Sequence, residues 1–355
     1  MTRFLTALLK WYRRHRRDLP WRRTRNPYRI FVSEVMLQQT QVSAVIPYYG
    51  RFLKAFPTVH ALARARKDRL MKLWEGLGYY ARARNLQAAA KRIVTDHGGR
   101  IPRDPETFSK LPGAGPYTTA AVLSIAFGAA EAAVDGNVKR VVSRLFDIDR
   151  PLKPDDPEIR TRARRLMGGN AGTYNQAMME LGATLCLPKR PACLLCPVRA
   201  HCRAFKAGTV EHRPVVAARK ARPHLRVVAG ILKKNGDVLI GRRPDRGLLG
   251  GLWEFPGGKV RRGETLQKAL EREFREELGI DVEAGKPVAK VEHAYTHFTV
   301  TLHGLPCTLR RGTPAALVHS AIRWTPPAAL GRYAMPEANR KLWRELSGRK
   351  ITLSP

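Results

Sequence analysis

Four cysteine residues lie within one short stretch of the chain, Cys186, Cys193, Cys196 and Cys202. Their spacing is C-x6-C-x2-C-x5-C, and thiols at this density indicate a metal site. Zinc sites usually combine two short C-x2–4-C pairs, and this stretch has only one. An iron–sulfur cluster and a zinc ion therefore both stay open at this point. We expect Cys307, which stands alone, to be an ordinary buried thiol.

Two carboxyl groups lie in apolar surroundings. Glu34 is placed within the apolar segment 31–37, where burial would favour its neutral form and suit it to general acid catalysis. Asp135 follows a short run of apolar residues and precedes a basic helix that carries Lys139, Arg140 and Arg144. Both residues could instead have structural roles. Most glutamates lie at the protein surface, and an aspartate at the start of a helix is usually an N-cap.

The segment LPGAGPYTTAAVLSIAF, residues 111–127, predicts a hairpin between two helices. Gly113 and Gly115 permit a tight turn, and Pro116 suits the first turn of the second helix. Backbone N–H groups of such a hairpin can hold a phosphate without recognising base sequence. A plain helix–helix turn is the alternative.

These residues need elements to position them. Residues 1–205 show helical spacing of apolar residues, for example over 58–74, 81–96, 105–111, 117–128, 137–146, 158–168 and 173–185. Residues 206–225 are basic and contain two prolines, so we interpret them as an interdomain linker. Residues 226–355 change to strands, with a hairpin around KKNG, one helix at 265–278, and strands at 288–293, 298–302 and 305–310. This second domain is expected to be α+β.

The helix of the second domain carries a patterned set of charges. Residues 258–280 fit G-x5-E-x7-R-E-U-x-E-E-x-G-U, the pattern of a Nudix box. Glu273, Glu276 and Glu277 share one helical face, where they would repel one another unless a cation neutralised them. Mg²⁺ bridging to a diphosphate would do so, and Arg272 could orient the carboxylates. A solvated charged helix is the alternative.

The overall charge favours a polyanionic partner. The chain has 355 residues with 65 Lys and Arg against 29 Asp and Glu, a formal net charge of +36. Nucleic acid is the first candidate, and a generally basic proteome or an acidic membrane surface is the alternative. No apolar run approaches the roughly 20 residues of a membrane span. The Arg-rich residues 1–17 keep helical spacing, so we expect a first helix and not a transit peptide. We expect a cytoplasmic, nucleoid-associated protein.

Three segments, residues 21–42, 74–86 and 175–186, closely resemble the MutY family of adenine DNA glycosylases, and the resemblance covers nearly all of residues 1–205. It implies an all-α helix-hairpin-helix domain in which Glu34 protonates N7 of a flipped adenine and Asp135 stabilises the cationic sugar. Tyr117 and Asn137 would support the sugar and Asp135. Tyr117 occupies the position where glycosylases that also cut the strand carry a lysine, so we predict a monofunctional enzyme.

The same resemblance implies further contacts. Trp21, Arg22 and Glu180 match positions that line the adenine pocket. Gln38, Gln39, Thr40 and Tyr79 match residues that wedge into the stack opposite the flipped base; core aromatics are the alternative for Trp21 and Tyr79. The four clustered cysteines match the ligands of a [4Fe–4S] cluster.

The second domain departs from the family pattern, because that family usually keeps the Nudix fold but has lost the box. Its domain checks for 8-oxoguanine with a Phe-Ser-His loop, and this chain has Tyr295, Thr296 and His297 there. The replacements keep an aromatic ring, a hydroxyl and the imidazole, so we expect recognition of 8-oxoguanine to survive. The intact box leaves open a Mg²⁺-dependent hydrolysis of oxidised nucleoside triphosphates.

Three hypotheses follow. The first is excision of adenine from 8-oxoguanine·adenine or guanine·adenine mispairs in double-stranded DNA by a multidomain monomer with no membrane partner. The second is a nucleotide pyrophosphohydrolase that uses its N-terminal part as a DNA tether. The third is a non-catalytic damage binder, against which the retention of Glu34 counts.

Overall fold

The structure is a computed structural model that describes residues 2–216, 222–247 and 249–348. The chain divides into two compact units, one made of residues 1–65 and 84–219 and the other of residues 66–83 and 220–355. Part of the predicted linker, residues 217–221, lies outside the described residues. No helix in the described ranges is long and apolar enough to cross a membrane.

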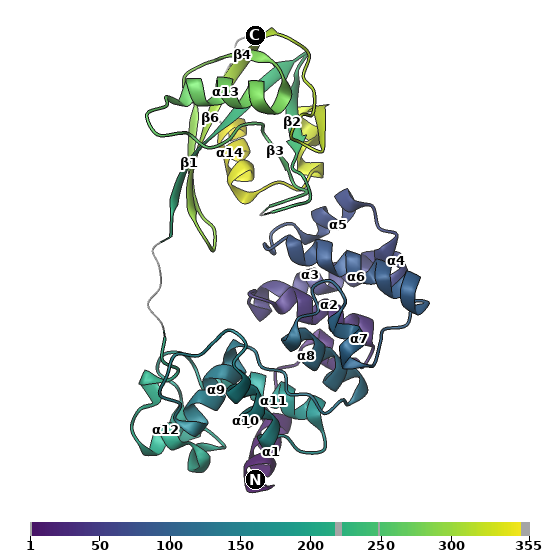
Figure 1. Cartoon of the computed structure of the whole chain (residues 1–355), viewed down its shortest axis with the longest axis vertical. Helices are drawn as coiled ribbons and strands as arrows, with labels where there is room; N and C mark the ends of the chain where they lie inside the picture. Colours follow the sequence, from purple (N-terminus) through teal and green to yellow (C-terminus); the bar gives the residue numbers. More distant parts are fainter. Residues whose placement is uncertain (1, 217–221, 248, 349–355) are drawn as a thin grey trace. The chain divides into compact units, whose positions relative to one another are not determined.

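The first unit is helical, as predicted (Figure 1). Between residues 2 and 216, the part of this region that is described, no β-strand is formed. Its elements are α1 (Thr2–His15), η1 (Pro20–Arg23), α2 (Pro27–Leu37), α3 (Val42–Ala55), α4 (Val59–Ala63), α6 (Ala81–His97), α7 (Pro105–Ser109), α8 (Pro116–Phe127), α9 (Gly136–Phe146), α10 (Pro157–Leu166), α11 (Ala171–Thr184), η2 (Cys193–Leu195), η3 (Arg199–His201), α12 (Arg203–Lys206) and η4 (Val210–His212), the first three residues of α6 being counted with the other unit.

The helix predicted over residues 58–74 is wrong as a single element, because the structure has α4 and then α5 (Lys67–Trp74). The side-chain amide of Gln87 donates to the carbonyl oxygens of Leu62 at 3.3 Å and Ala65 at 2.7 Å. These hydrogen bonds satisfy carbonyl groups that a continuous helix would have used internally. The break therefore depends on a partner on α6 that the local pattern does not reveal.

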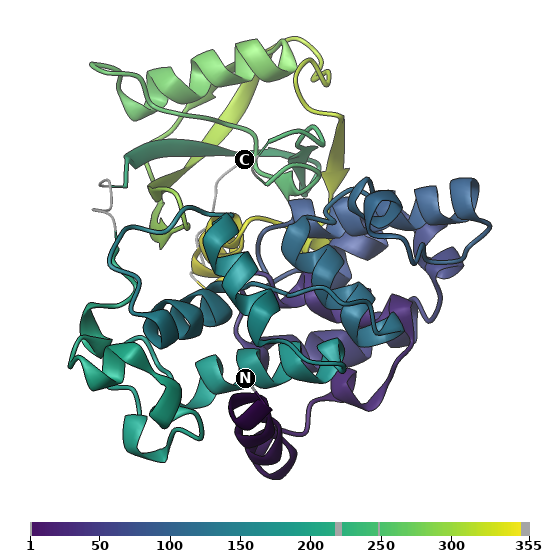
Figure 2. The same cartoon turned by 60° about the horizontal axis from the view of Figure 1, so that its bottom comes forward.

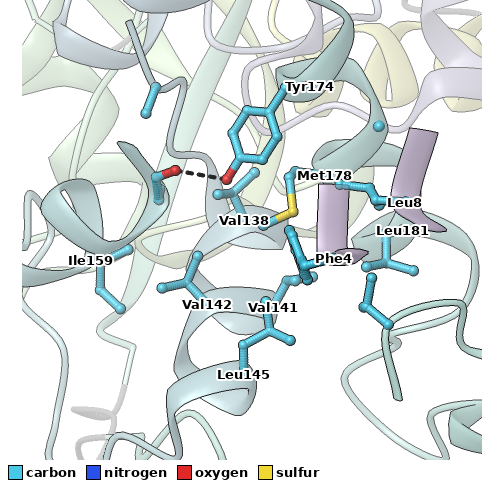
Figure 3. Close-up of a cluster of buried hydrophobic side chains, with 14 of the residues drawn as sticks. Phe4, Leu8, Val138, Val141, Val142, Leu145, Ile159, Tyr174, Met178 and Leu181 are labelled. Carbon is cyan, nitrogen blue, oxygen red and sulfur yellow. Dashed lines mark hydrogen bonds between the residues drawn. The ribbon is translucent and has the colours of Figure 1, made fainter. Parts of the chain in front are cut away.

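One apolar core joins the helices that frame the C-terminal half of this unit. Figure 3 shows side chains of α1, α9, α10 and α11 meeting in it, and Tyr174 donates a hydrogen bond from its hydroxyl to the carbonyl of Ala163 at 2.8 Å. Phe4 and Leu8 of α1 are buried there. Each large apolar side chain buried in this way stabilises the fold by about 1.5–3 kcal/mol. The N-terminal arginine-rich segment is thus a packed helix, as its spacing predicts.

The second unit contains a seven-stranded mixed sheet in which β1 and β6 are parallel and the other pairs antiparallel. Its elements are α5, β1 (His224–Lys234), β2 (Asp237–Arg242), β3 (Trp253–Glu254), α13 (Leu266–Leu278), β4 (Asp281–Ala284), β5 (Ala289–Ala294), β6 (Thr299–Arg311), β7 (Ala321–Thr325), η5 (Pro327–Arg332) and α14 (Glu337–Gly348). The β1–β2 hairpin turns at Asn235 and Gly236, both with positive φ, as the KKNG segment predicts.

Helices cover both faces of this sheet. Apolar residues of α13 form one core with the sheet, and those of α14 form a second core with it; Figure 2 shows α13, in light green, lying along one side of the strands. The strands predicted over 298–302 and 305–310 are one strand, β6, in the structure. Pairing with β1, β4 and β5 holds it extended through Gly304, where the sequence pattern indicates an end.

Candidate active site

A cavity of about 670 Å³ opens in the helical unit. Residues that the sequence places far apart meet at its wall, from α2, α8, the start of α9 and α11. Among the residues predicted for the site, those that line it are Trp21, Arg22, Glu34, Gln38, Gln39, Thr40, Tyr117, Asp135, Asn137 and Glu180. Its volume is within the range of small-molecule pockets.

Glu34 is a buried acid in the wall of this cavity. It lies on α2, a helix capped by Asn26, and is only 4 % exposed. The hydroxyl of Tyr117 donates to its Oε2 at 2.6 Å. Burial raises the pKa of Glu34 to about 7, although the hydrogen bond from Tyr117 lowers it, and the charge of Asp135 raises it further. A carboxyl group with this pKa can hold or release a proton near neutral pH, as general acid catalysis requires.

Asp135 caps α9 and also faces the cavity. Its Oδ1 accepts from the backbone N–H of Val138 at 2.7 Å, and its Oδ2 accepts from Nδ2 of Asn137 at 2.9 Å. Both oxygens are thus held in a fixed orientation. Burial raises the pKa of Asp135, and these two hydrogen bonds oppose that change. The Asp135 carboxylate therefore has both roles at once: it caps α9 and it lines the cavity.

A charged cluster closes another part of the wall. Glu180 on α11 is fully buried and accepts from Nε and Nη2 of Arg17, at 2.8 and 2.7 Å, and from Nη2 of Arg22 at 2.7 Å. Burial alone would raise the pKa of Glu180, but Arg17 and Arg22 lower it to about 2. The adjacent Trp21 packs edge-on against Tyr49. The cluster keeps a permanent negative charge paired beside the cavity.

Two of the predicted wedge residues have strained backbones. Gln39 has φ 55° and Tyr79 has φ 48°, both in the left-handed region that non-glycine residues seldom adopt. Gln38 is anchored through a hydrogen bond from its Nε2 to Oγ1 of Thr118 at 2.9 Å. Tyr79 belongs to the other unit and does not line the cavity. Its ring lies under the guanidinium of Arg82.

The predicted hairpin lies between α7 and α8. Gly113 has φ 79°, so its turn requires a residue that tolerates the left-handed region. Gly115 instead has extended backbone with φ −68° and open space around its Cα, so its conformation does not require glycine. Pro116 occupies the first position of α8, as predicted.

The four clustered cysteines follow α11. Burial raises the pKa of Cys196 to about 11, and the charges of Cys186, Cys202 and Cys193 raise it further. The four thiols therefore lie close enough to interact electrostatically. Yet no three His, Cys, Asp or Glu side chains of the described part of the chain are placed to hold a metal ion. Four thiols near one another in the sequence are a donor set that suits a zinc ion or an iron–sulfur cluster.

Two arginines of α9 connect to this cysteine segment. Arg140 donates to Oδ1 of Asn137 at 2.9 Å and to the carbonyl oxygens of Gly182 and Cys186, both at 2.7 Å. The side chain that steadies Asp135 is thereby joined to the first cysteine.

Arg144 is only 1 % exposed. It donates to the carbonyl oxygens of Leu187, Pro188, Val210 and Arg213, and to Sγ of Cys186.

Ion pairs connect the charged side chains of α13 in the second unit. Arg272 donates to Glu264 at 2.8 Å, Glu273 at 2.8 Å and Glu276 at 3.1 Å. Burial raises the pKa of Glu277 to about 7. A side chain at Gly258 would collide with the Glu273 carboxylate, so the loop lies tightly over this helix. These carboxylates keep the oxygen donors that a magnesium ion needs, although no metal-holding group is formed in the ranges described.

The turn that carries Tyr295, Thr296 and His297 connects β5 and β6. Tyr295 is only partly exposed: its ring stacks on Phe298 with 4.8 Å between the ring centroids, and it packs against the core that α14 shares with the sheet. Thr296 and His297 are exposed. The aromatic residue therefore anchors the turn, and the hydroxyl and imidazole are the groups that it presents.

Sequence reasoning missed several residues at the cavity wall. Arg17, Gln176 and Met179 also line it, and Met179 Sδ lies 3.3 Å from the Tyr117 hydroxyl. Arg17 and Gln176 lie inside segments with strong helical spacing, and nothing local distinguishes them from surface residues. Only the buried acid at Glu180, which needs a cationic partner, could have indicated Arg17.

Comparison with known proteins agrees with this geometry. Residues 32–167 match the family model of the HhH-GPD superfamily base excision DNA repair proteins, and residues 227–345 match that of the NUDIX domain. The structure is similar to a thermostable thymine-DNA glycosylase, with 31 % identity, a TM-score of 0.54, and coverage of 57 % of this chain and 95 % of that chain. It is also similar to a trapped endonuclease III–DNA covalent intermediate, with 26 % identity, a TM-score of 0.51, and coverage of 57 % and 94 %.

The fold and the cavity thus define a helix-hairpin-helix base excision repair protein followed by a Nudix-like domain. The human adenine DNA glycosylase is 35 % identical to the chain over 414 residues, covering 99 % of this chain and 75 % of the human protein. The chain belongs to the adenine DNA glycosylase family.

Proposed function

We propose that the protein is a monofunctional glycosylase that hydrolyses the N-glycosidic bond of adenine mispaired with 8-oxoguanine or guanine. The observation that carries this proposal is the pairing of two acids with different surroundings in one cavity. Glu34 has a pKa of about 7 in a buried position, and Asp135 is held by two hydrogen bonds. One carboxyl group that can hold a proton and a second that is fixed in orientation suit acid-assisted cleavage of a glycosidic bond.

In the proposed reaction, Glu34 gives its proton to N7 of the flipped adenine, which makes the base a better leaving group. The bond from C1′ to the base breaks with its electron pair going to adenine, and Asp135 stabilises the cationic sugar. Water then adds to C1′, and its proton returns to the Glu34 carboxylate. Tyr117 keeps Glu34 in place and presents no amine, so no Schiff base forms and the strand stays intact.

The partner is double-stranded DNA that contains the mispair. Trp21, Arg22 and Glu180 would contact the adenine, and Gln38, Gln39, Thr40 and Tyr79 would fill the gap left in the stack. The strained backbones of Gln39 and Tyr79 are consistent with that role. Gly113 and Gly115 would bring backbone N–H groups to a phosphate. Thr296 and His297, exposed on a turn anchored by Tyr295, would recognise 8-oxoguanine. Such a protein would act in the cytoplasm at the nucleoid.

Cys186, Cys193, Cys196 and Cys202 would hold a [4Fe–4S] cluster, in agreement with the family and with the electrostatic interactions among their thiols. When bound, the cluster would supply structural support and would not take part in hydrolysis. Arg140 and Arg144 would hold the adjoining backbone relative to α9.

Single-turnover cleavage of a labelled duplex with one 8-oxoguanine·adenine pair tests the proposal. Alkali should reveal a nick at the adenine after reaction with the wild-type protein, and no nick should form without alkali. Glu34→Gln should abolish the alkali-labile site, whereas Glu106→Gln, which changes an exposed carboxylate, should not. Intact strands after treatment with cluster-loaded wild-type protein would refute the assignment.

The intact Nudix box favours a second candidate function, hydrolysis of oxidised nucleoside triphosphates. Glu273, Glu276 and Glu277 would hold Mg²⁺, which would bridge to the diphosphate, and Arg272 already orients the first two. Release of pyrophosphate from 8-oxo-dGTP should then require Mg²⁺ and disappear in Glu276→Gln. Equal release without the metal, or in that variant, would remove this candidate.

A further inference from the structure

Residues 66–83 lie between two stretches of the helical unit in the sequence but belong to the second unit in the structure. They contain α5 and the predicted wedge residue Tyr79. Asp68 lies in the first turn of α5 and Glu75 directly follows its last residue, so about two helical turns separate these acids. Each of them accepts a hydrogen bond from residues that follow position 220 in the same unit.

Glu75 makes the more buried of these two connections. Its side chain is 8 % exposed, and its Oε1 accepts from the backbone N–H of Met335 at 3.1 Å. Its Oε2 pairs with Lys72 of α5 and, at 3.5 Å, with Arg340 of α14. A buried carboxylate needs such partners, so Glu75 is bound to both elements at once. The end of α5 is thereby fixed against the segment that leads into α14.

Asp68 makes the second connection. Its Oδ1 accepts from Nε1 of the buried Trp253 at 3.3 Å. The backbone N–H of Trp253 donates to the carbonyl oxygen of Ala334 at 2.9 Å, and Ala334 precedes Met335 in the chain. Hydrogen bonds and the chain itself therefore form a closed ring that runs through Asp68, β3, residues 334 and 335, and Glu75. This ring prevents α5 from turning about either contact alone.

The turn after α5 extends this placement to Tyr79. The buried Trp74 donates from Nε1 to the carbonyl oxygen of Gly78 at 3.1 Å, and Nη2 of Arg82 donates to the same oxygen at 3.1 Å. The next residue is Tyr79, whose hydroxyl is hydrogen-bonded to the hydroxyl of Thr296 in the turn between β5 and β6. The wedge side chain and the predicted 8-oxoguanine-recognising turn are therefore held within one unit.

We propose that Glu75 is a positioning residue for 8-oxoguanine recognition: it docks α5 within the second unit and so holds Tyr79 beside the turn of residues 295–297. This inference rests on the proposed function. Two groups that must engage one base bind it better when their separation is fixed before DNA arrives, because less ordering is then lost on binding. Guanine lacks the O8 and N7–H groups of 8-oxoguanine, so it gains less from this arrangement. Loss of Glu75 should therefore weaken discrimination between the two bases.

Rate ratios in matched variants test this role. Single-turnover adenine release is measured with the full, cluster-loaded chain on duplexes that carry adenine opposite 8-oxoguanine or opposite guanine. In Glu75→Ala, the ratio of the 8-oxoguanine rate to the guanine rate should fall about tenfold. Glu75→Gln keeps an acceptor for the Met335 N–H, so its ratio should fall only about threefold. Hydrogen exchange of the Met335 amide should be faster in Glu75→Ala than in wild type.

Glu271→Ala is the matched control, because Oε1 of Glu271 also accepts from a backbone N–H in this unit, that of Ala284 at 3.1 Å, and joins α13 to β4. It should leave the ratio and the exchange at Met335 unchanged. A ratio that stays constant in Glu75→Ala, or that falls equally in Glu271→Ala, would overturn the inference while leaving adenine excision intact. Wild-type protein that releases no adenine from either duplex would refute the proposed function and the inference with it.

Discussion

The Tyr117 hydroxyl donates a hydrogen bond of 2.6 Å to Oε2 of Glu34, and this contact joins the second helix of the hairpin to α2. A helix end that would approach a phosphate is thereby coupled to the acid that would protonate the base. The same hydrogen bond opposes the effect of burial on the pKa of Glu34. Activity and pH dependence should therefore respond together to changes at this contact.

Replacement of Tyr117 by Phe should shift the pH dependence of base release. Without the hydrogen bond, the pKa of Glu34 rises above about 7, so the decline of the single-turnover rate on the alkaline side should begin at higher pH. We expect a rate reduction of about tenfold at pH 7 from lost positioning. Tyr28→Phe, which removes a buried hydroxyl on α2 that donates to the carbonyl oxygen of Phe56, is the control. An unchanged pH profile would contradict the coupling.

Glu34→Gln should stabilise the protein at alkaline pH while abolishing excision. The pKa of Glu34 is about 7 in the folded chain and 4.5 otherwise, so its contribution to stability is present below pH 4.5 and is lost as pH rises through 7. Glutamine avoids this loss, which amounts to at most about 3 kcal/mol. Thermal unfolding of both proteins from pH 5 to pH 8 should give a difference in Tm that grows with pH. A difference in Tm that does not change with pH would mean that burial does not raise the pKa of Glu34 in the folded protein.

Arg17→Met should destabilise the helical unit more at neutral than at acid pH. Glu180 has a pKa lowered to about 2, so its ion pairs contribute stability above pH 4.5 that is lost as pH falls through 2. Removal of Arg17 leaves a buried carboxylate with Arg22 alone, at a cost of about 2 kcal/mol after allowing for the partial exposure of Arg17. Denaturant unfolding at pH 7 and pH 3 measures this, with the exposed Arg14→Met as control. Equal losses at both values would exclude an effect of Glu180 ionisation.

Arg140→Met should slow excision although Arg140 does not line the cavity that would hold the adenine. The change removes the hydrogen bonds to Asn137, Gly182 and Cys186, so Asp135 loses its indirect support. We expect the single-turnover rate to fall about tenfold or more. The visible absorbance of the iron–sulfur cluster should also be lower than in the wild-type protein. Lys139→Met removes the same charge from the neighbouring residue of α9, whose Nζ donates to the exposed backbone carbonyl oxygens of residues 153 and 154. Equal effects of the two changes would indicate a role of charge alone.

Local patterns predicted the elements that carry chemistry, because their signals are short in range. The apolar neighbours of Glu34, the left-handed turn at Gly113 and the Asn235 turn all depend on residues within a few positions. The break after Ala63 could not be predicted, since the Gln87 amide that stabilises it lies on another helix. Nor could the continuity of β6, which three neighbouring strands impose. The wall residues Arg17 and Gln176 are likewise defined only by partners more than 150 positions away.

The Arg144 side chain has a consequence for how the cysteine segment can change. One guanidinium gathers carbonyl oxygens from residues 187 and 188 at one end of this segment and from residues 210 and 213 at the other. The segment between them is closed into a loop at its base, which limits the conformations that its chain can adopt. Within this loop Val198 and Ala204 are buried, and Sγ of Cys202 contacts the carbonyl oxygen of Arg144. The segment is therefore both tied to α9 and packed on it, and a change in its length should disturb the helix that Asp135 caps.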